Sequence, residues 1–326
     1  MLERKRLWGI VWTVGAVLVA GCKGVPPARL WAQKSDAVEV RREMPADAEL
    51  EKRAQAHAHY AAGVIAEVSE QPDAALKEYS QAALKDPDNE SLVLEVSRRF
   101  LQNKQPEQAL ELLSHAAARP NASGAVFARL GLVYSQLGKS DLAMAASRTA
   151  IKKAPGSLAG YQNLFLNCLQ GKQPAEAEKV LDDAARQPRP EAEFLIGLAE
   201  LYSHLAIQVP SRRKDSNAKA LALLNRVEKL KPLNPAVSLK LAEDYSIAGD
   251  SERAAQLYKE LLKKMPETPG LRDRVRARLA EIYLRNSEHK LAAEELERII
   301  ADDPTNAQAY YSLGTLALED RSRARR

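Results

Sequence analysis

One alanine returns through this chain at a fixed interval. The repeated residues are Ala75, Ala109, Ala143, Ala177, Ala220, Ala254 and Ala292. The first four stand thirty-four residues apart, and two insertions interrupt the later part of the series. A fixed period of this length predicts a repeat array, because one short unit cannot bury its apolar face without neighbours stacked on it.

The residues around each alanine predict a pair of helices. A small residue often stands twelve positions earlier, as at Gly63, Ser97 and Gly131, and would let two antiparallel helices approach closely. Apolar residues follow four and seven positions after most of the alanines, which keeps one stripe of a helix against a core. Gly138 and Gly249 fall where an inner turn is expected. Each unit is therefore expected to read helix, short turn, helix, stop.

A proline follows each alanine after eleven or twelve residues and ends the second helix of the unit, because proline cannot continue a helix. The prolines are Pro87, Pro120, Pro155, Pro188, Pro232, Pro266 and Pro304. Glycine and aromatic residues are scarce, and nothing favours a sheet. We expect an all-α fold.

The repeated pattern resembles the tetratricopeptide repeat (TPR). The third unit carries the resemblance most fully, with Leu130-Gly131, Tyr134, Ala143, Ala150 and Pro155. The resemblance implies a right-handed α-solenoid of about seven helix-turn-helix units and a C-terminal half unit that begins at Ala307. The expected units are 56–89, 90–123, 124–157, 158–189, 190–234, 235–268 and 273–306.

Three units depart from the pattern. Phe165 replaces the small residue in the fourth unit, and Ser147 replaces the apolar residue in the third. The fifth unit has about eleven extra residues between Tyr202 and Lys219, including the cluster Arg212-Arg213-Lys214. We expect this insertion to lengthen the first helix and then loop out before Ala220. It is either a tolerated surface insertion or a docking loop for an acidic partner.

The chain begins with the order of a secretory signal. The basic segment Arg4-Lys5-Arg6 precedes an apolar run from Leu7 to Ala20, and Gly21-Cys22 follows. Val19-Ala20-Gly21-Cys22 resembles the lipobox of bacterial lipoproteins, which implies removal of residues 1–21 and lipidation of Cys22. The alternative is an uncleaved signal anchor. With Lys23 after the cysteine, the resemblance favours the outer membrane over the inner membrane. The lipidated protein and the uncleaved signal anchor would both place the helical body outside the cytoplasm.

The remaining boundaries follow from composition. Residues 22–46 contain Pro26-Pro27 and Pro45 without a helical period, so we expect a lipidated N-terminus and a flexible tether. The repeat solenoid is expected over 47–318. Residues 319–326 form a basic tail, which is either a solvated end or a contact for anionic lipid headgroups.

Residue constellations for catalysis are missing from the sequence. His57 and His59 point apart on a helix, the other histidines have no companions at ligand spacing, and no phosphate loop or nucleophile elbow occurs. Cys168 lies in an apolar stripe, where a buried small hydrophobe is expected. We therefore expect a protein that is not an enzyme and binds no metal, cofactor or nucleic acid.

The family resemblance implies that the first helices of successive units line a concave, protein-binding groove. The lysine and asparagine arrangement that clamps a peptide carboxylate in some members is missing. The groove residues that the resemblance implies are Tyr60, Val64, Leu94, Arg98, Leu132, Gln136, Gln162, Leu166, Phe194, Leu198, Tyr202, Leu239, Glu243, Glu281, Arg285 and Tyr311.

The sequence therefore favours a TPR-containing bacterial lipoprotein that faces the periplasm. We expect a scaffold that binds proteins or peptides of an envelope assembly, pilus or secretion machine. The alternative is an accessory subunit for polysaccharide synthesis or export that contacts a glycan or a synthase. Tyr310, Tyr311 and Leu313 make the last half unit unusually apolar, so this end is either truncated or meets a partner or a second copy.

Overall fold

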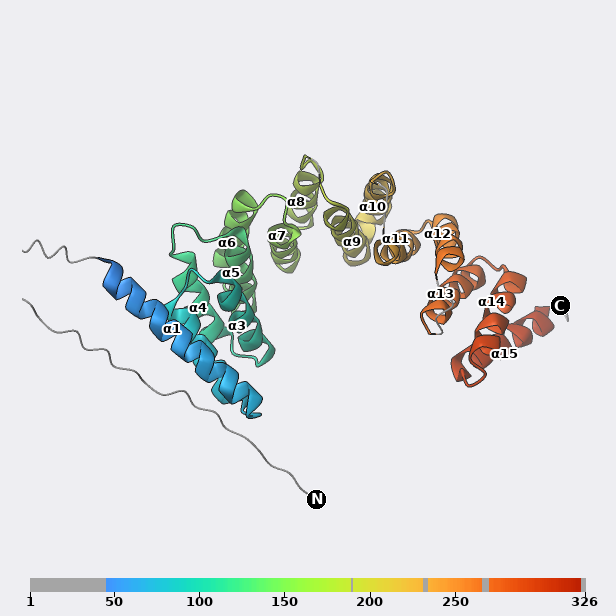
Figure 1. The fold of residues 1–326 in the computed structure, drawn as a ribbon. Coiled ribbons are helices and arrows are strands. Elements are labelled where there is room, and N and C mark those ends of the chain that lie inside the picture. The colour runs from blue at the N-terminus through green and yellow to red at the C-terminus, as the bar shows by residue number, and fades with distance from the viewer. Residues whose placement is uncertain (1–44, 189, 231–233, 266–269, 324–326) are drawn as a thin grey trace, which may run out of the picture. The chain divides into compact units, whose positions relative to one another are not determined.

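The structure, a computed structural model, describes residues 45–188, 190–230, 234–265 and 270–323. Over these ranges the chain forms fifteen α-helices and one short 3-10 helix, and no strand (Figure 1). The predicted all-α class is confirmed. The predicted signal peptide, Cys22 and all but the last two residues of the predicted tether lie outside the described residues.

The helices follow one another with short connections. The first eight are α1 (Pro45–Val68), α2 (Pro72–Lys85), α3 (Glu90–Gln102), α4 (Pro106–Ala117), α5 (Gly124–Gln136), α6 (Ser140–Lys153), α7 (Leu158–Gln170) and α8 (Pro174–Ala185). The others are α9 (Ala192–Gln208), η1 (Pro210–Arg212), α10 (Arg213–Glu228), α11 (Pro235–Ala248), α12 (Ser251–Lys264), α13 (Leu271–Arg285), α14 (His289–Asp302) and α15 (Ala307–Arg323).

Neighbouring helices pair in the way that the repeat predicts. Odd-numbered helices are the first helices of the units, and each from α3 to α13 packs against the even-numbered helix that follows it. First helices of adjacent units also touch, as α5 does with α7 and α7 with α9. The predicted stack of helix-turn-helix units is confirmed.

The repeated alanines form the contact between paired helices. All seven are buried, and so are the apolar residues four positions later in the six units that have one. A Cβ atom added to Gly131 would lie 2.8 Å from Oγ of Ser147 on α6, so the small residue lets the two helices touch. Ser147, which replaces the apolar residue in this unit, is fully buried and donates its hydroxyl to the carbonyl of Ala143.

The inner turn of most units contains one residue with a left-handed backbone. Gly138 and Gly249 have φ values of 70° and 100°, as expected for turn glycines. Residues at the same place in four other units adopt positive φ without being glycine, which costs conformational energy. These are Glu70, Lys104, Lys172 and Ser287.

The fifth unit corrects one expectation. Its first helix is longer than most, as predicted, but the extra residues do not loop out, because α10 begins at Arg213 directly after η1. Arg212 forms an ion pair with Glu178 of α8, and Lys219 contacts Glu178 and Asp182 at 2.9 and 2.6 Å. The insertion is therefore helical and packed on the preceding unit.

The last helix extends past the predicted end of the solenoid. α15 runs to Arg323 and includes the first five residues of the predicted basic tail. None of the helices in the described ranges combines the length and the apolar character needed to cross a membrane.

Candidate functional site

The predicted groove residues fall on the first helices, and thirteen of the sixteen keep accessible surface. Eight are exposed, namely Tyr60, Val64, Arg98, Gln136, Gln162, Glu281, Arg285 and Tyr311. Five are half-buried, namely Leu94, Leu132, Leu166, Leu239 and Glu243. These thirteen residues stand at three positions of the unit that are four residues apart, so the accessible groups share one side of each first helix, here called the accessible side.

Phe194, Leu198 and Tyr202 are wrongly placed in this set, because all three are buried. Tyr202 donates its hydroxyl to Asp182, twenty residues earlier, and Tyr245 in the sixth unit makes the same bond to Asn225. These two tyrosines therefore hold the same repeat position, which shifts the fifth unit by two residues from the predicted register. Two residues turn a helix by about 200°, so the shift moves the predicted face into the core.

A cavity on the accessible side lies at the first two units. Its volume is about 500 Å³, and Tyr60 of α1, with 48% of its surface exposed, stands at its edge. The ring of Tyr60 meets the buried ring of Tyr79 at 5.4 Å between centroids. The remaining lining residues are Ala56, His57, Glu67, Asp86, Asn89, Ser91, Leu92, Glu95, Val96 and Arg99. A cavity of this size accepts one or two large side chains.

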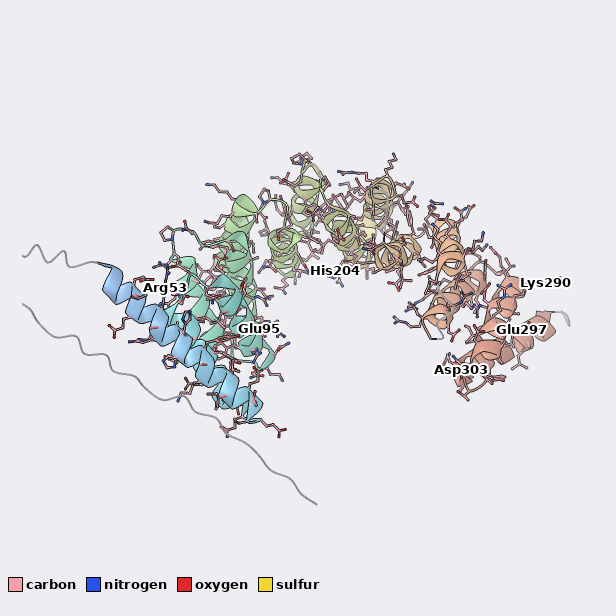
Figure 2. The ribbon with its side chains drawn as sticks, in the orientation of Figure 1. Arg53, Glu95, His204, Lys290, Glu297 and Asp303 are labelled. Atoms are coloured by element: carbon pink, nitrogen blue, oxygen red, sulfur yellow. The ribbon has the colours of Figure 1, made fainter. Side chains whose placement is uncertain are left out.

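Fixed charges stand around the cavity. Arg99 of α3 lies over the Tyr79 ring and donates to Glu67 at 3.0 Å and to Glu95 at 2.9 Å (Glu95 is labelled in Figure 2). Hydrogen bonds from Arg98 and Arg99 lower the pKa of Glu95 to about 2. Burial, together with the hydrogen bond to Glu67, raises the pKa of Tyr79 to about 12. The network joins α1, α2 and α3 through Glu67, Tyr79 and Arg99.

Sequence reasoning missed Arg99. Its position in the unit, two residues after the small one, is held by buried Val133 in the third unit and by Ile282 in the seventh. A charged side chain where other units place an apolar one is a signal that a comparison between units could have found. The structure explains it by the two carboxylates that Arg99 joins across α1 and α3.

A second departure at this position lies between α9 and α11. Asp244 is 5% exposed, and its Oδ2 atom has no hydrogen-bond partner in the described part of the chain. Burial and the negative charge of Glu200 raise the pKa of Asp244 to about 7. Lys240 lies nearby, but it forms its ion pair with Glu200. The packing between α9 and α11 thus contains a buried carboxyl group that is only partly ionised near neutral pH.

Cys168 is buried, as predicted, and burial raises the pKa of its thiol. It lies at a cavity of about 640 Å³ on the side of the second helices, between α6, α7 and α8. A thiol with a raised pKa is a poor nucleophile. Apolar residues and charged residues of both signs line this cavity, so its charge does not favour one class of ligand.

Two of the five histidines contact an identified side chain. His59 lies 2.7 Å from a carboxylate oxygen of Glu78, and the ring of His204 meets Phe165 edge-on (His204 is labelled in Figure 2). The ranges that the structure describes contain no group of three or more histidine, cysteine, aspartate or glutamate residues that could hold a metal ion.

Residues 245–317, from the end of α11 into α15, match the family model of the tetratricopeptide repeat. No curated protein sequence matches the chain. Among solved structures, the C-terminal part of a TPR repeat-containing protein from Cytophaga hutchinsonii is similar with 16% identity and a TM-score of 0.48, over 78% of this chain and 99% of that chain.

Two further solved structures are similar over most of their own length. Pseudomonas aeruginosa PilF has 17% identity and a TM-score of 0.39, over 69% of this chain and 96% of its own. YrrB, described as a TPR protein with an unusual peptide-binding site, has 13% identity and a TM-score of 0.40, over 63% and 98%.

Proposed function

This chain carries tetratricopeptide repeats, and we propose from that premise that it is a scaffold for protein or peptide segments rather than an enzyme. The segments bind along the accessible side of the first helices. The observation that carries the proposal is the cavity beside Tyr60, whose walls are held by the ion pairs of Arg99. A preformed site loses little conformational entropy when a ligand binds.

The chemistry of the cavity favours an apolar side chain of the bound segment. Tyr60, Tyr79, Leu92 and Val96 contribute the apolar surface, while Arg99 already satisfies Glu67 and Glu95. Burying one large apolar side chain here would contribute roughly 1.5 to 3 kcal/mol. Leu132 and Leu166 continue the accessible side on the next units and would add further apolar contacts.

Tyr60→Ala is expected to weaken peptide binding about tenfold, because it removes an exposed aromatic wall of the cavity. The ligands are peptides selected from a random displayed library on the full chain, and affinities are measured by isothermal titration. Leu142→Ala is the matched control, since Leu142 is 48% exposed on the second helix of the third unit. Equal losses in both variants, or a library that yields no ligand, would contradict the proposed site.

The location of the scaffold is a further part of the proposal. Residues 1–21 are removed as a signal peptide, lipidated Cys22 anchors the chain, and the repeats face the periplasm, with the outer membrane favoured over the inner. The support is the order of basic, apolar and small residues before Cys22. The partners would then belong to an envelope assembly, pilus or secretion machine, and confinement at the membrane raises their effective concentration.

Cys22→Ser is expected to abolish acyl labelling and to release the chain from the membrane fraction, because stable anchoring needs the lipid chains that the thiol and the new amino terminus carry. Labelling with an alkyne fatty acid and fractionation measure the two effects. Cys168→Ser, at the other cysteine of the chain, should keep both. Labelling that survives in Cys22→Ser would reject the lipid anchor.

Direct glycan contact, one form of the polysaccharide alternative, loses support from the burial of two side chains. Glycans bind on exposed aromatic platforms beside polar groups. Of the four aromatic residues in the predicted groove, Phe194 and Tyr202 lie in the core, which leaves Tyr60 and Tyr311 at opposite ends of the repeats. A protein or peptide segment therefore fits the accessible side better than a sugar chain.

The proposal also includes self-association of the chain. The last half unit would provide a second contact surface for it.

A further inference from the structure

The last helix, α15, has two apolar faces. Ala309 and Leu316 are buried, with Leu313 packed beside Ala309 in the cluster that contains Ile299 of α14. The opposite face is uncovered in the described part of the chain: Tyr310 is 51% exposed, and Ala307, Gly314 and Ala317 are exposed beside it. Leu318, 70% exposed, and Tyr311 of the predicted groove, 72% exposed, border this face.

The uncovered face corresponds to the face that other first helices bury against the second helix of their unit. Gly314 holds the repeat position of Gly131 and of Ala280, and Ala280 is fully buried. A Cβ atom added to Gly131 would meet α6, whereas one added to Gly314 would meet no atom within 4 Å. α15 is thus a first helix whose second-helix contact is missing among the described residues.

The first unit shows what fills such a face. A Cβ atom added to Gly63 would lie 2.7 Å from ring carbons of Tyr79, so the tyrosine ring of α2 occupies the space that the glycine of α1 leaves. α15 carries both parts of this contact on one face, the exposed ring of Tyr310 and the open notch at Gly314.

These two parts match across a two-fold axis. When two α15 helices lie antiparallel and cross near residue 312, Tyr310 of each copy faces Gly314 of the other. The same arrangement places Ala307 opposite Ala317, so small residues let the helices approach at the ends of the contact. A two-fold contact needs one surface that complements itself, and this face meets that need without any charged residue between Ala307 and Leu318.

We propose that α15 is a self-association surface that pairs with α15 of a second copy of this chain, with each Tyr310 ring seated on the Gly314 notch of the other copy. This pairing specifies which residues meet in the self-association named under the proposed function. It does not depend on peptide binding in the groove. One helix per copy buries little surface, so we expect a weak dimer with a dissociation constant of about 10 to 100 µM. Confinement at a membrane would strengthen it.

Sedimentation equilibrium of the full chain in a density-matched mild detergent tests the pairing, over about 1 to 300 µM so that the range brackets the expected constant. The wild-type mass should rise toward that of a dimer. Gly314→Lys should raise the dissociation constant at least tenfold, because the side chain fills the notch and adds a charge to an apolar contact. Lysine has a higher helix propensity than glycine, so the variant should keep its helical circular dichroism.

Gln308→Lys is the matched control, because it adds the same charge to an exposed position of α15 beside the apolar face. Its dissociation constant should stay within about twofold of the wild type. A wild-type chain that remains a monomer over the whole range would overturn the inference, and so would a Gly314→Lys variant that associates as strongly as the wild type. Neither result would bear on the proposed peptide binding at Tyr60.

Discussion

Replacing Gly131 with leucine is expected to lower the free energy of unfolding by about 2 to 4 kcal/mol. Even a Cβ atom at this position would lie 2.8 Å from Oγ of Ser147 and 3.2 Å from the carbonyl oxygen of Ala143. The second contact is to backbone, which cannot rotate away. A leucine must therefore push α5 from α6 and open the packing of the third unit.

The chain offers a control at the same repeat position. A Cβ atom at Gly314 would meet no atom within 4 Å, so Gly314→Leu makes the same chemical change without a clash. Leucine also favours helix more than glycine, and this variant should be as stable as the wild type or more so. Urea unfolding followed by circular dichroism measures both variants. Equal losses of stability would mean that helix spacing does not explain the small residue.

The sequence was sufficient to predict most of the fold, because the burial pattern of a repeat is local. The alanine, the residues four and seven positions after it, and the proline all lie within one pair of helices, so their spacing fixes which side of each helix faces its pair partner. The thirteen accessible groove positions came instead from the family resemblance, carried over unit by unit. None of these predictions required knowledge of which units touch.

The fifth unit could not be predicted so well, because an insertion breaks the count on which the register depends. The prediction kept the spacing of the other units up to Tyr202, whereas the hydrogen bond from Tyr202 to Asp182 fixes the helix two residues away from that register. This bond joins two units and has no local signature in the sequence. A tyrosine twenty residues after a polar partner, present again at Tyr245 and Asn225, would have been the usable signal.

The charged part of the site was missed for a related reason. Arg99 bonds to Glu67, thirty-two residues away, and Asp244 lies near Glu200 of the preceding unit. Such pairs depend on how first helices of adjacent units face each other. The period of the sequence specifies that they are adjacent and does not specify which side chains meet. The pairs around the cavity therefore came only from the structure.

Asp244→Asn is expected to stabilise the chain above neutral pH by an amount on the order of a few kcal/mol. Burial, and to a smaller extent the negative charge of Glu200, raises the pKa of this carboxyl from 3.8 to about 7 in the folded chain. The unfolded chain therefore loses the proton near pH 3.8, while the folded chain holds it until about pH 7. The stability that protonated Asp244 contributes is complete below about pH 4 and is lost as the pH rises to about 7 and beyond.

The neutral amide removes that pH dependence, so the difference between Asp244→Asn and the wild type should grow from about pH 4 to about pH 8 and vanish at the acid end. Urea unfolding at a series of pH values measures it. Asp244→Leu should also stabilise the chain at alkaline pH, because Leu201 and Ile282 fill the same position in neighbouring units. Glu243→Gln is the control: it removes a charge from the adjacent, half-buried residue and should have a much smaller effect. If the difference in stability between Asp244→Asn and the wild type stays constant across this pH range, Asp244 is solvated or paired in the folded chain.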